Sequence, residues 1–357
     1  MRNPGRGLFF DVDPHHPFFG DAFAGANETG KDERENRSSS SAPDLAPGRI
    51  SLAPRFSPGQ VFRYAMEFQT TTSTARSGLG SDLQGPSTLV ITWDATIRME
   101  VLPAQNPAAG GARLRITYEK STANVNADAF DPTAEETQEQ YQKLAGKVVE
   151  FTLDAGGNVT SVSGLEGIMN NEKAVQTARD WIRRLDASSG APPGGVKVGE
   201  TWRSEQPADS LPVAGLVWRT DSQYLRNEPC HPSNPDLPPS VSAEPASGAG
   251  AAATSEAGDT CAVILTNLDL VRQKSGHGET PEDYRKNGVR TSGKWSGGGQ
   301  SVVYVSLRSG AVVSVSQSGT EDMNVTITNS ENVSLRYAGT VTSRSQVELI
   351  SDDSNGN

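Results

Sequence analysis

The longest regular pattern in the sequence is an alternation of apolar and mostly polar residues from Leu89 to Val101. Leucine, isoleucine, tryptophan, alanine, methionine and valine occupy every second position, and threonine, aspartate, arginine and glutamate fill most of the others. Because successive side chains of a β-strand point to opposite faces, the alternation predicts a long strand with one buried and one hydrated face.

Shorter segments with the same alternation lie on both sides of this one. They cover residues 62–68, 114–118, 149–153, 216–218, 264–270, 303–307, 313–315 and 333–341. Ten or so half-hydrated strands are typical of an antiparallel sheet, and glycines at Gly157 and Gly310 supply turns between neighbouring segments. The sequence therefore predicts a series of hairpins.

Two segments interrupt the strands with helical spacing. Residues 133–145 begin with a capping-box pattern and stop at a glycine, and residues 165–185 carry one apolar stripe that fits across a concave sheet face. We predict a mainly β (α+β) fold, a large curved antiparallel sheet or half-barrel with one or two covering helices.

The composition changes along the chain. Residues 1–48 and 351–357 predict disordered tails, residues 49–350 a β-rich domain, and residues 228–260 a flexible insert within it. The turn before Phe62 resembles the turn before Trp202, which suggests two related halves, 49–190 and 191–350. A common way of starting a strand after a turn explains the same likeness.

The insert is bracketed by Cys230 and Cys261, the two cysteines of the chain. We predict a disulfide between them, and the alternative is two unrelated buried thiols. A disulfide indicates an oxidising compartment. The expected location is periplasmic or secreted, with a leader that the sequence as given does not contain, and the alternative is cytoplasmic.

A net charge of −11 opposes binding to phosphate backbones, so nucleic acid is not an expected partner. The sequence also contains no apolar run long enough for an integral membrane segment.

Residues for catalysis are scarce. The four histidines, His15, His16, His231 and His277, all lie outside the predicted strands and helices. We therefore predict no catalytic residue, metal site or cofactor, although a hydrolase with an unrecognised site stays an alternative. The glycines Gly297 to Gly299 precede a strand pattern rather than a helix, which argues against a phosphate loop and predicts a hinge or bulge.

The remaining candidates are apolar residues on strands and on the second helix. A curved sheet with few covering helices leaves an apolar trough, so we predict that it binds a lipid or an acylated protein. The candidate ligand-binding residues are Trp93, Ile97, Tyr118, Trp181 and Trp218. The alternative is a structural or protein-interaction module whose side chains fill its own core.

Residues 56–64, 146–159, 162–165 and 196–202 together resemble an uncharacterised family of bacterial envelope proteins and lipoproteins. In that family a strand, a glycine turn, a second strand and a Gly-Leu pair precede a helix and a Val-Gly-Glu-x-Trp strand opening. The resemblance covers residues 50–350 without the insert and implies no catalytic residue. The chain departs from the lipoprotein members because it has no cysteine near the N-terminus. The architecture also resembles, at fold level, the periplasmic lipoprotein carriers.

Overall fold

The computed structural model describes residues 47–78, 87–103, 111–128, 134–154, 157, 159–168, 191–192, 194–208, 211–230, 259–272, 280–286 and 288–352. The predicted N-terminal tail, most of the insert and Trp181 lie outside these residues. The strands are β1 (Val61–Gly78), β2 (Ser87–Leu102), β3 (Ala112–Ala127), β4 (Val148–Leu153), β5 (Val159–Ser163), β6 (Thr201–Pro207), β7 (Leu216–Pro229), β8 (Thr260–Arg272), β9 (Arg290–Ser306), β10 (Val312–Thr328) and β11 (Ser334–Asp352).

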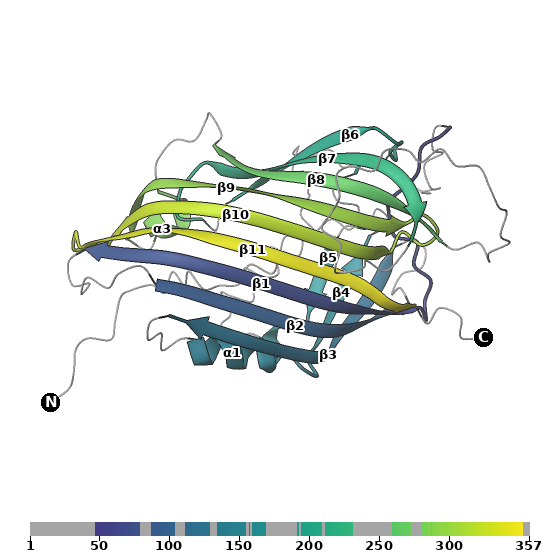
Figure 1. Cartoon of the computed structure of the whole chain (residues 1–357), viewed down its shortest axis with the longest axis horizontal. Helices are drawn as coiled ribbons and strands as arrows, with labels where there is room; N and C mark the ends of the chain where they lie inside the picture. Colours follow the sequence, from purple (N-terminus) through teal and green to yellow (C-terminus); the bar gives the residue numbers. More distant parts are fainter. Residues whose placement is uncertain are drawn as a thin grey trace.

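All of these strands belong to one antiparallel sheet in the order β5-β4-β3-β2-β1-β11-β10-β9-β8-β7-β6 (Figure 1). Strands that follow one another in sequence pair with each other, apart from β5 and β6, and β1 also pairs with β11. The sheet is open, with β5 and β6 at its edges. The predicted mainly β class and curved antiparallel sheet are therefore confirmed.

The strands are longer than the sequence patterns suggest. β11 extends through Ser351 and Asp352, the first two residues of the predicted C-terminal tail. The expected hinge or bulge at Gly297 to Gly299 is wrong, because these glycines lie in the middle of β9 and pair with β10 without a register shift. A glycine lacks the side chain that gives a strand its alternation, so this part of β9 carries no sequence signal.

The described helices are short. α1 (Ala134–Gln142) falls within the predicted segment 133–145 and contacts β3, and α3 (Glu282–Lys286) contacts β9. Of the predicted helix 165–185, the described part contains the single 3-10 turn η2 (Leu165–Gly167), where Leu165 packs on Val149 and Val162. None of the described helices is long and apolar enough to cross a membrane.

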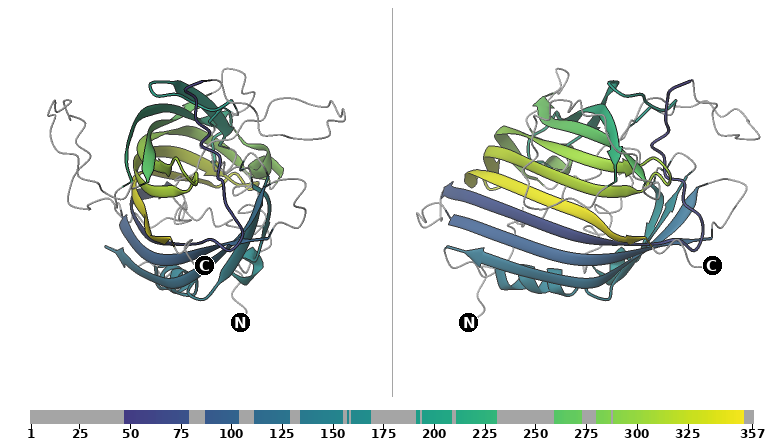
Figure 2. Two further views of the ribbon diagram at one scale, coloured as in Figure 1. Left: turned by 90° about the vertical axis from the view of Figure 1, so that its right-hand side faces the viewer. Right: turned by 45° about the vertical axis from the view of Figure 1, so that its right-hand side comes forward.

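The sheet curls around one of its faces (Figure 2). We call the face that carries Phe62, Trp93 and Val315 the inner face and the opposite one the outer face. The strand registers place the buried apolar side chains of β1, β2 and β10 together on the inner face, while Thr, Gln, Arg and Glu side chains alternate with them on the outer face. The predicted division into a buried and a hydrated face thus extends across the sheet.

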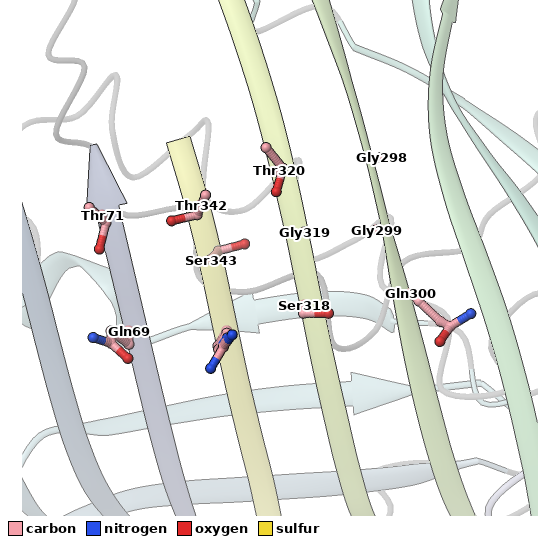
Figure 3. A pocket seen from close by; sticks show the side chains of 11 residues that line it. Gln69, Thr71, Gly298, Gly299, Gln300, Ser318, Gly319, Thr320, Thr342 and Ser343 are labelled. Atoms are coloured by element: carbon pink, nitrogen blue, oxygen red, sulfur yellow. The ribbon is translucent and has the colours of Figure 1, made fainter. Parts of the chain in front are cut away.

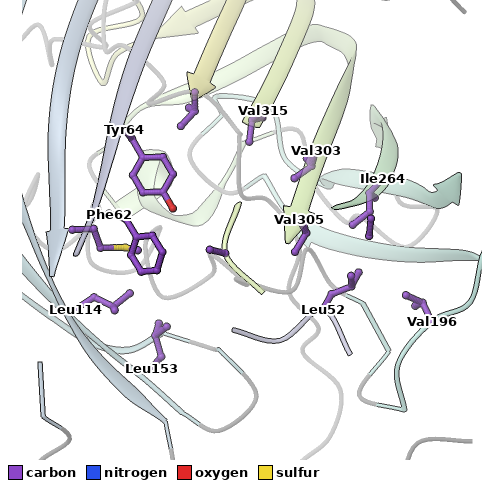
Figure 4. Packing of buried hydrophobic residues seen from close by; sticks show 14 of the residues in the cluster. Leu52, Phe62, Tyr64, Leu114, Leu153, Val196, Ile264, Val303, Val305 and Val315 are labelled. Carbon is purple, nitrogen blue, oxygen red and sulfur yellow. The ribbon is translucent and has the colours of Figure 1, made fainter. Parts of the chain in front are cut away.

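The curl is closed at one end by a hydrophobic cluster, the closed-end cluster (Figure 4). Leu153 of β4 and Trp202 of β6 both belong to it, so strands near opposite edges of the sheet meet there. Leu52 and Val196, which are 3% and 0% exposed, come from the segments that precede β1 and β6. The buried members are Leu52, Phe62, Tyr64, Met99, Val101, Leu114, Leu153, Val196, Trp202, Tyr224, Ala262, Ile264, Val303, Val305, Ala311, Val315 and Val347.

Two short segments pair across the closed end. Ile50 and Val196 exchange backbone hydrogen bonds of 2.8 Å in each direction. Arg49 Nη2 lies 2.7 Å from Glu200 Oε1, and the Arg49 guanidinium also donates to the carbonyl of Gly195. The chain before β1, in the middle of the sheet, is therefore fixed to the chain before β6, at one edge.

The turns that open β1 and β6 have the same geometry. Gly59 and Gly199 both have positive φ, +90° and +83°, and each donates its N–H to the end of the next strand, at Val101 and Tyr224. The residue after each glycine accepts a hydrogen bond from the backbone N–H three positions earlier, through Gln60 Oε1 and Glu200 Oε2. The likeness in sequence between the two strand openings thus extends to their hydrogen bonds.

The predicted disulfide is present. Cys230 and Cys261 are bonded with their Cα atoms 5.0 Å apart and 31 positions apart in sequence. Cys261 is fully buried in β8, and the bond joins the end of β7 to the start of β8 at the base of the insert.

Removal of the disulfide with the double variant Cys230→Ala/Cys261→Ala is expected to lower the free energy of unfolding by about 3–4 kcal/mol, because the bond closes a long loop in the unfolded chain. Urea denaturation measures the change. A reducing agent should destabilise the wild-type protein and leave the double variant unchanged, and two free thiols in the untreated protein would contradict the assignment.

Truncation of the closed-end cluster provides a matched comparison. Ile264 is 0% exposed and Ile350 is 54% exposed. Ile264→Ala is expected to cost about 2–5 kcal/mol in urea denaturation because it leaves a cavity, and Ile350→Ala less than about 0.5 kcal/mol. Equal costs would show that the closed end is not a packed core.

Candidate functional site

The inner face changes character with distance from the closed end. A row of valines in register, Val347, Val315 and Val303, belongs to the closed-end cluster. The next inner row lies two residues further along each strand. On β11, β10, β9, β8 and β7 it carries only polar side chains. We call this row the polar belt, and its residues are Ser345, Gln317, Ser301, Thr266 and Ser222.

The belt is partly satisfied by its own hydrogen bonds. The hydroxyls of Ser222 and Thr266 lie 2.8 Å apart. Gln317 Oε1 and Ser345 Oγ, which face each other across β10 and β11, are buried and have no hydrogen-bond partner in the described part of the chain. A buried polar atom without a partner is costly, so these two atoms are available to a water or a ligand group.

Beyond the belt the inner face becomes apolar again. Trp218, Trp295 and Ile327 are half-buried and pack against a second cluster at the end of the sheet opposite the closed end, the open-end cluster. Its buried members are Ala208, Leu211, Val213, Leu216, Leu270 and Val325. The inner face thus has apolar zones at both ends and a polar band between them.

Glu321 is the carboxylate on this part of the inner face. Its Oε2 accepts a 2.7 Å hydrogen bond from Trp295 Nε1, and burial raises the pKa of the carboxyl against the opposing effect of that bond. Gly297 lies directly opposite on β9, where a Cβ atom would come within 2.8 Å of Glu321 Cγ. A glycine at 297 is therefore what leaves room for the glutamate.

The predicted ligand-binding residues do not form one group. Trp93, Ile97 and Tyr118 lie on neighbouring strands of the inner face, with Ile97 and Tyr118 in register. Trp218 lies on β7, with five strands between it and β2, and packs in the open-end cluster. Trp181 lies outside the described residues.

Trp93 is tightly enclosed. It is 3% exposed, its ring centre is 5.6 Å from that of Tyr141 on α1 and 6.4 Å from that of Tyr118, and its Nε1 donates to Ser121 Oγ at 2.8 Å. Burial raises the pKa of Tyr118 to about 12. At this position the sheet is therefore filled by its own side chains and those of α1.

The described residues contain no group of three or more His, Cys, Asp or Glu side chains that could hold a metal ion. The four histidines lie outside them. The carboxylates of the outer face are largely engaged in ion pairs, such as Glu150 with Arg113 and Arg115, which hold the pKa of Glu150 below its usual range.

The outer face carries a pocket of about 670 Å³ across β1, β11, β10 and β9 (Figure 3). Polar side chains line it, with Gln69, Ser318 and Gln300 in one row with Arg344. Sequence reasoning did not find this pocket, because it depends on the pairing of β1 with β11. Glu321, by contrast, was detectable in sequence, since it alternates in phase with Met323 and Val325 on an apolar strand face.

No protein-family model matches the chain, and no curated protein matches its sequence. Among solved structures the chain is similar to lipovitellin, studied for its lipid–protein interactions, with 11% identity and a TM-score of 0.43, over 85% of this chain and 26% of that one. It is also similar to the outer membrane protein OprG of Pseudomonas aeruginosa, with 6% identity and a TM-score of 0.16, over 83% and 97% of the two chains. The chain spans about a quarter of the lipovitellin chain, and each likeness is a distant one of fold.

The substitution Glu321→Gln tests the burial of the carboxyl. Because the folded protein raises the pKa, the unfolded chain ionises more readily, so ionisation lowers stability as the pH rises above about 4.3. The variant is expected to be more stable than the wild type at neutral pH and to lose this advantage near pH 4. Urea denaturation of both proteins at about pH 7 and about pH 4 measures the difference. An equal difference at both pH values would contradict the assignment.

Proposed function

We propose that the protein is a non-enzymatic binding protein that holds an apolar ligand, a lipid or the acyl chain of an acylated partner, against the inner face of its sheet. The observation that carries the proposal is the imbalance between sheet and cover. Among the described residues, eleven strands present a largely apolar inner face, and the helical segments are short: α1 packs on β2 and β3, η2 on β4 and β5, and α3 on β9.

The distribution of side chains on the inner face supports an amphiphilic ligand. Half-buried apolar residues such as Trp218, Trp295 and Leu268 provide a surface for a hydrocarbon chain. The polar belt lies between them and the closed end, with Gln317 Oε1 and Ser345 Oγ free among the described residues to accept hydrogen bonds. Pockets of this kind combine apolar walls with a few polar groups that fix orientation.

The disulfide supports an oxidising location. A bond between Cys230 and Cys261 persists in the periplasm or outside the cell, where lipids and acylated proteins must be carried through water. We therefore place the proposed activity in an extracytoplasmic compartment.

A structural or protein-interaction module is the second candidate. It is favoured by the self-filled parts of the inner face, where Trp93 is 3% exposed and Leu52 and Val196 close one end. In that case partners bind to loops or to the outer face, and no ligand enters the curl.

Two leucines of β8 provide the test. Leu268 points to the inner face and Leu265 to the outer face, and both are half-buried. Delipidated protein is expected to bind a fluorescent fatty-acid analogue, and Leu268→Lys to weaken binding at least about tenfold because a charge in an apolar site is costly. Leu265→Lys should leave the affinity within about twofold of the wild type, a few tenths of a kcal/mol, because its side chain points away from the ligand.

The readouts are fluorescence titration and mass spectrometry of lipids that purify with the protein. Thermal unfolding of both variants shows whether each is folded. Absence of both fluorescent-ligand binding and bound lipid would overturn the proposal in favour of the interaction module, and so would equal effects of the two folded variants.

A further inference from the structure

The outer-face pocket lies on the opposite side of the sheet from the proposed ligand face. Most of its lining is two parallel rows of side chains that the strand registers define, and Gly299, Gly319 and Ser343, which lie between the two rows along their strands, complete it. The first row crosses four strands as Gln69, Arg344, Ser318 and Gln300. The second, two residues further along each strand, is Thr71, Thr342, Thr320 and Gly298.

The chemistry of these rows is uniform. They supply two amides, four hydroxyls and one guanidinium, and no apolar or acidic side chain belongs to either row. At Gly298 the second row has no side chain, and Asp269 of β8, in register with Gly298, lies next to the row at that end. A lipid tail gains nothing from such a lining, whereas a ligand with many hydroxyl groups finds a donor or acceptor on each strand.

Arg344 is available to a ligand. Its backbone pairs with β1 and β10, but its guanidinium forms no ion pair or side-chain hydrogen bond within the described part of the chain. Other outer-face arginines are engaged, as Arg203 is with Asp221 at 2.6 Å and Arg115 with Glu150 at 2.9 Å. An unpaired guanidinium in the lining of a pocket, in a protein with a net charge of −11, points to a local site for one negative charge.

We propose that the outer-face pocket binds a short saccharide that carries one carboxylate. The Arg344 guanidinium would form a fork with the carboxylate, since this pair has matching bidentate geometry. Gln69 and Gln300 flank it on either side in the same row, and the threonines of the second row lie within reach of further hydroxyls. Neighbouring strands are about 4.8 Å apart, so polar groups repeat along the pocket at roughly the spacing of successive sugar rings.

The size of the pocket agrees with this ligand class. A volume of about 670 Å³ falls within the range of small-ligand sites. This inference goes beyond the apolar ligand of the inner face and does not depend on it, because the two sites use side chains that alternate along the same strands. Either site can fail its test while the other stands.

The test uses three probes on the full-length protein: cellobiouronic acid, which carries one carboxylate, its neutral counterpart cellobiose, and inorganic phosphate. Isothermal titration and ligand-observed saturation-transfer NMR measure binding up to about 10 mM, the range expected of weak polar sites. We expect the acid to bind, and cellobiose and phosphate to bind at least about tenfold more weakly, since each lacks one of the two kinds of contact.

Substitutions locate the site. Arg344→Gln is expected to weaken binding of the acid at least about tenfold and to leave binding of cellobiose unchanged, because only the carboxylate contact is lost. Arg336→Gln is the matched control, since Arg336 lies on the same face of β11 and donates to Asn324 instead. Gln300→Ala should weaken both saccharides.

Absence of binding of the acid would overturn the proposal. So would equal affinities for the acid and phosphate, which would define a site for simple anions, and so would an affinity that Arg344→Gln leaves unchanged while the variant remains folded by circular dichroism.

Discussion

The pairing of β1 with β11 is the interaction on which the rest of the structure depends. It joins residues near position 62 to residues near position 352 over the whole length of both strands. Without it, β1 to β5 and β6 to β11 are two separate meanders, each with an exposed edge. With it they form one sheet long enough to curl, so that both edges contribute to the closed-end cluster. Such non-local pairing is costly in chain entropy and slow to form.

The same pairing also determines which side chains can act together. Alternation assigns each residue of a strand to the inner or the outer face, but register across β1, β11, β10 and β9 assembles rows from distant parts of the chain. The polar belt and the outer-face pocket are both such rows. A shift of one residue in the pairing of β1 and β11 would move Gln69 to the inner face and Phe68 to the outer face, so packing of the closed end also fixes the composition of the pocket.

Much of the fold could be predicted from the sequence because alternation is a local property. The strand from Leu89 to Val101 is present within β2, and the cysteines that bracket the insert are bonded. The partners of the strands could not be predicted, because period-two patterning says which face a residue occupies and not which strand lies beside it. For the same reason Trp93 and Trp218 were grouped as one candidate site, although they pack in different clusters. The middle of β9 could not be recognised as a strand either, because Gly297 to Gly299 have no side chains that could alternate between apolar and polar.

The small and polar residues in the middle of the inner face bear on what the curl contains. When the side chains of a sheet fill its interior, they are large and apolar and pack about as densely as the molecules of an organic crystal, as at the closed end. The inner positions next to it are occupied instead by Ser345, Gln317 and Ser301, and then by Ser343, Gly319 and Gly299. Hydroxyls, glycines and the Gln317 amide at these six positions give up apolar contact and leave polar atoms to be satisfied, which lowers stability unless something else occupies the space. The proposed amphiphilic ligand rests on this pattern of apolar ends and a polar middle, since a sheet filled by its own side chains would place large apolar residues in the middle as well.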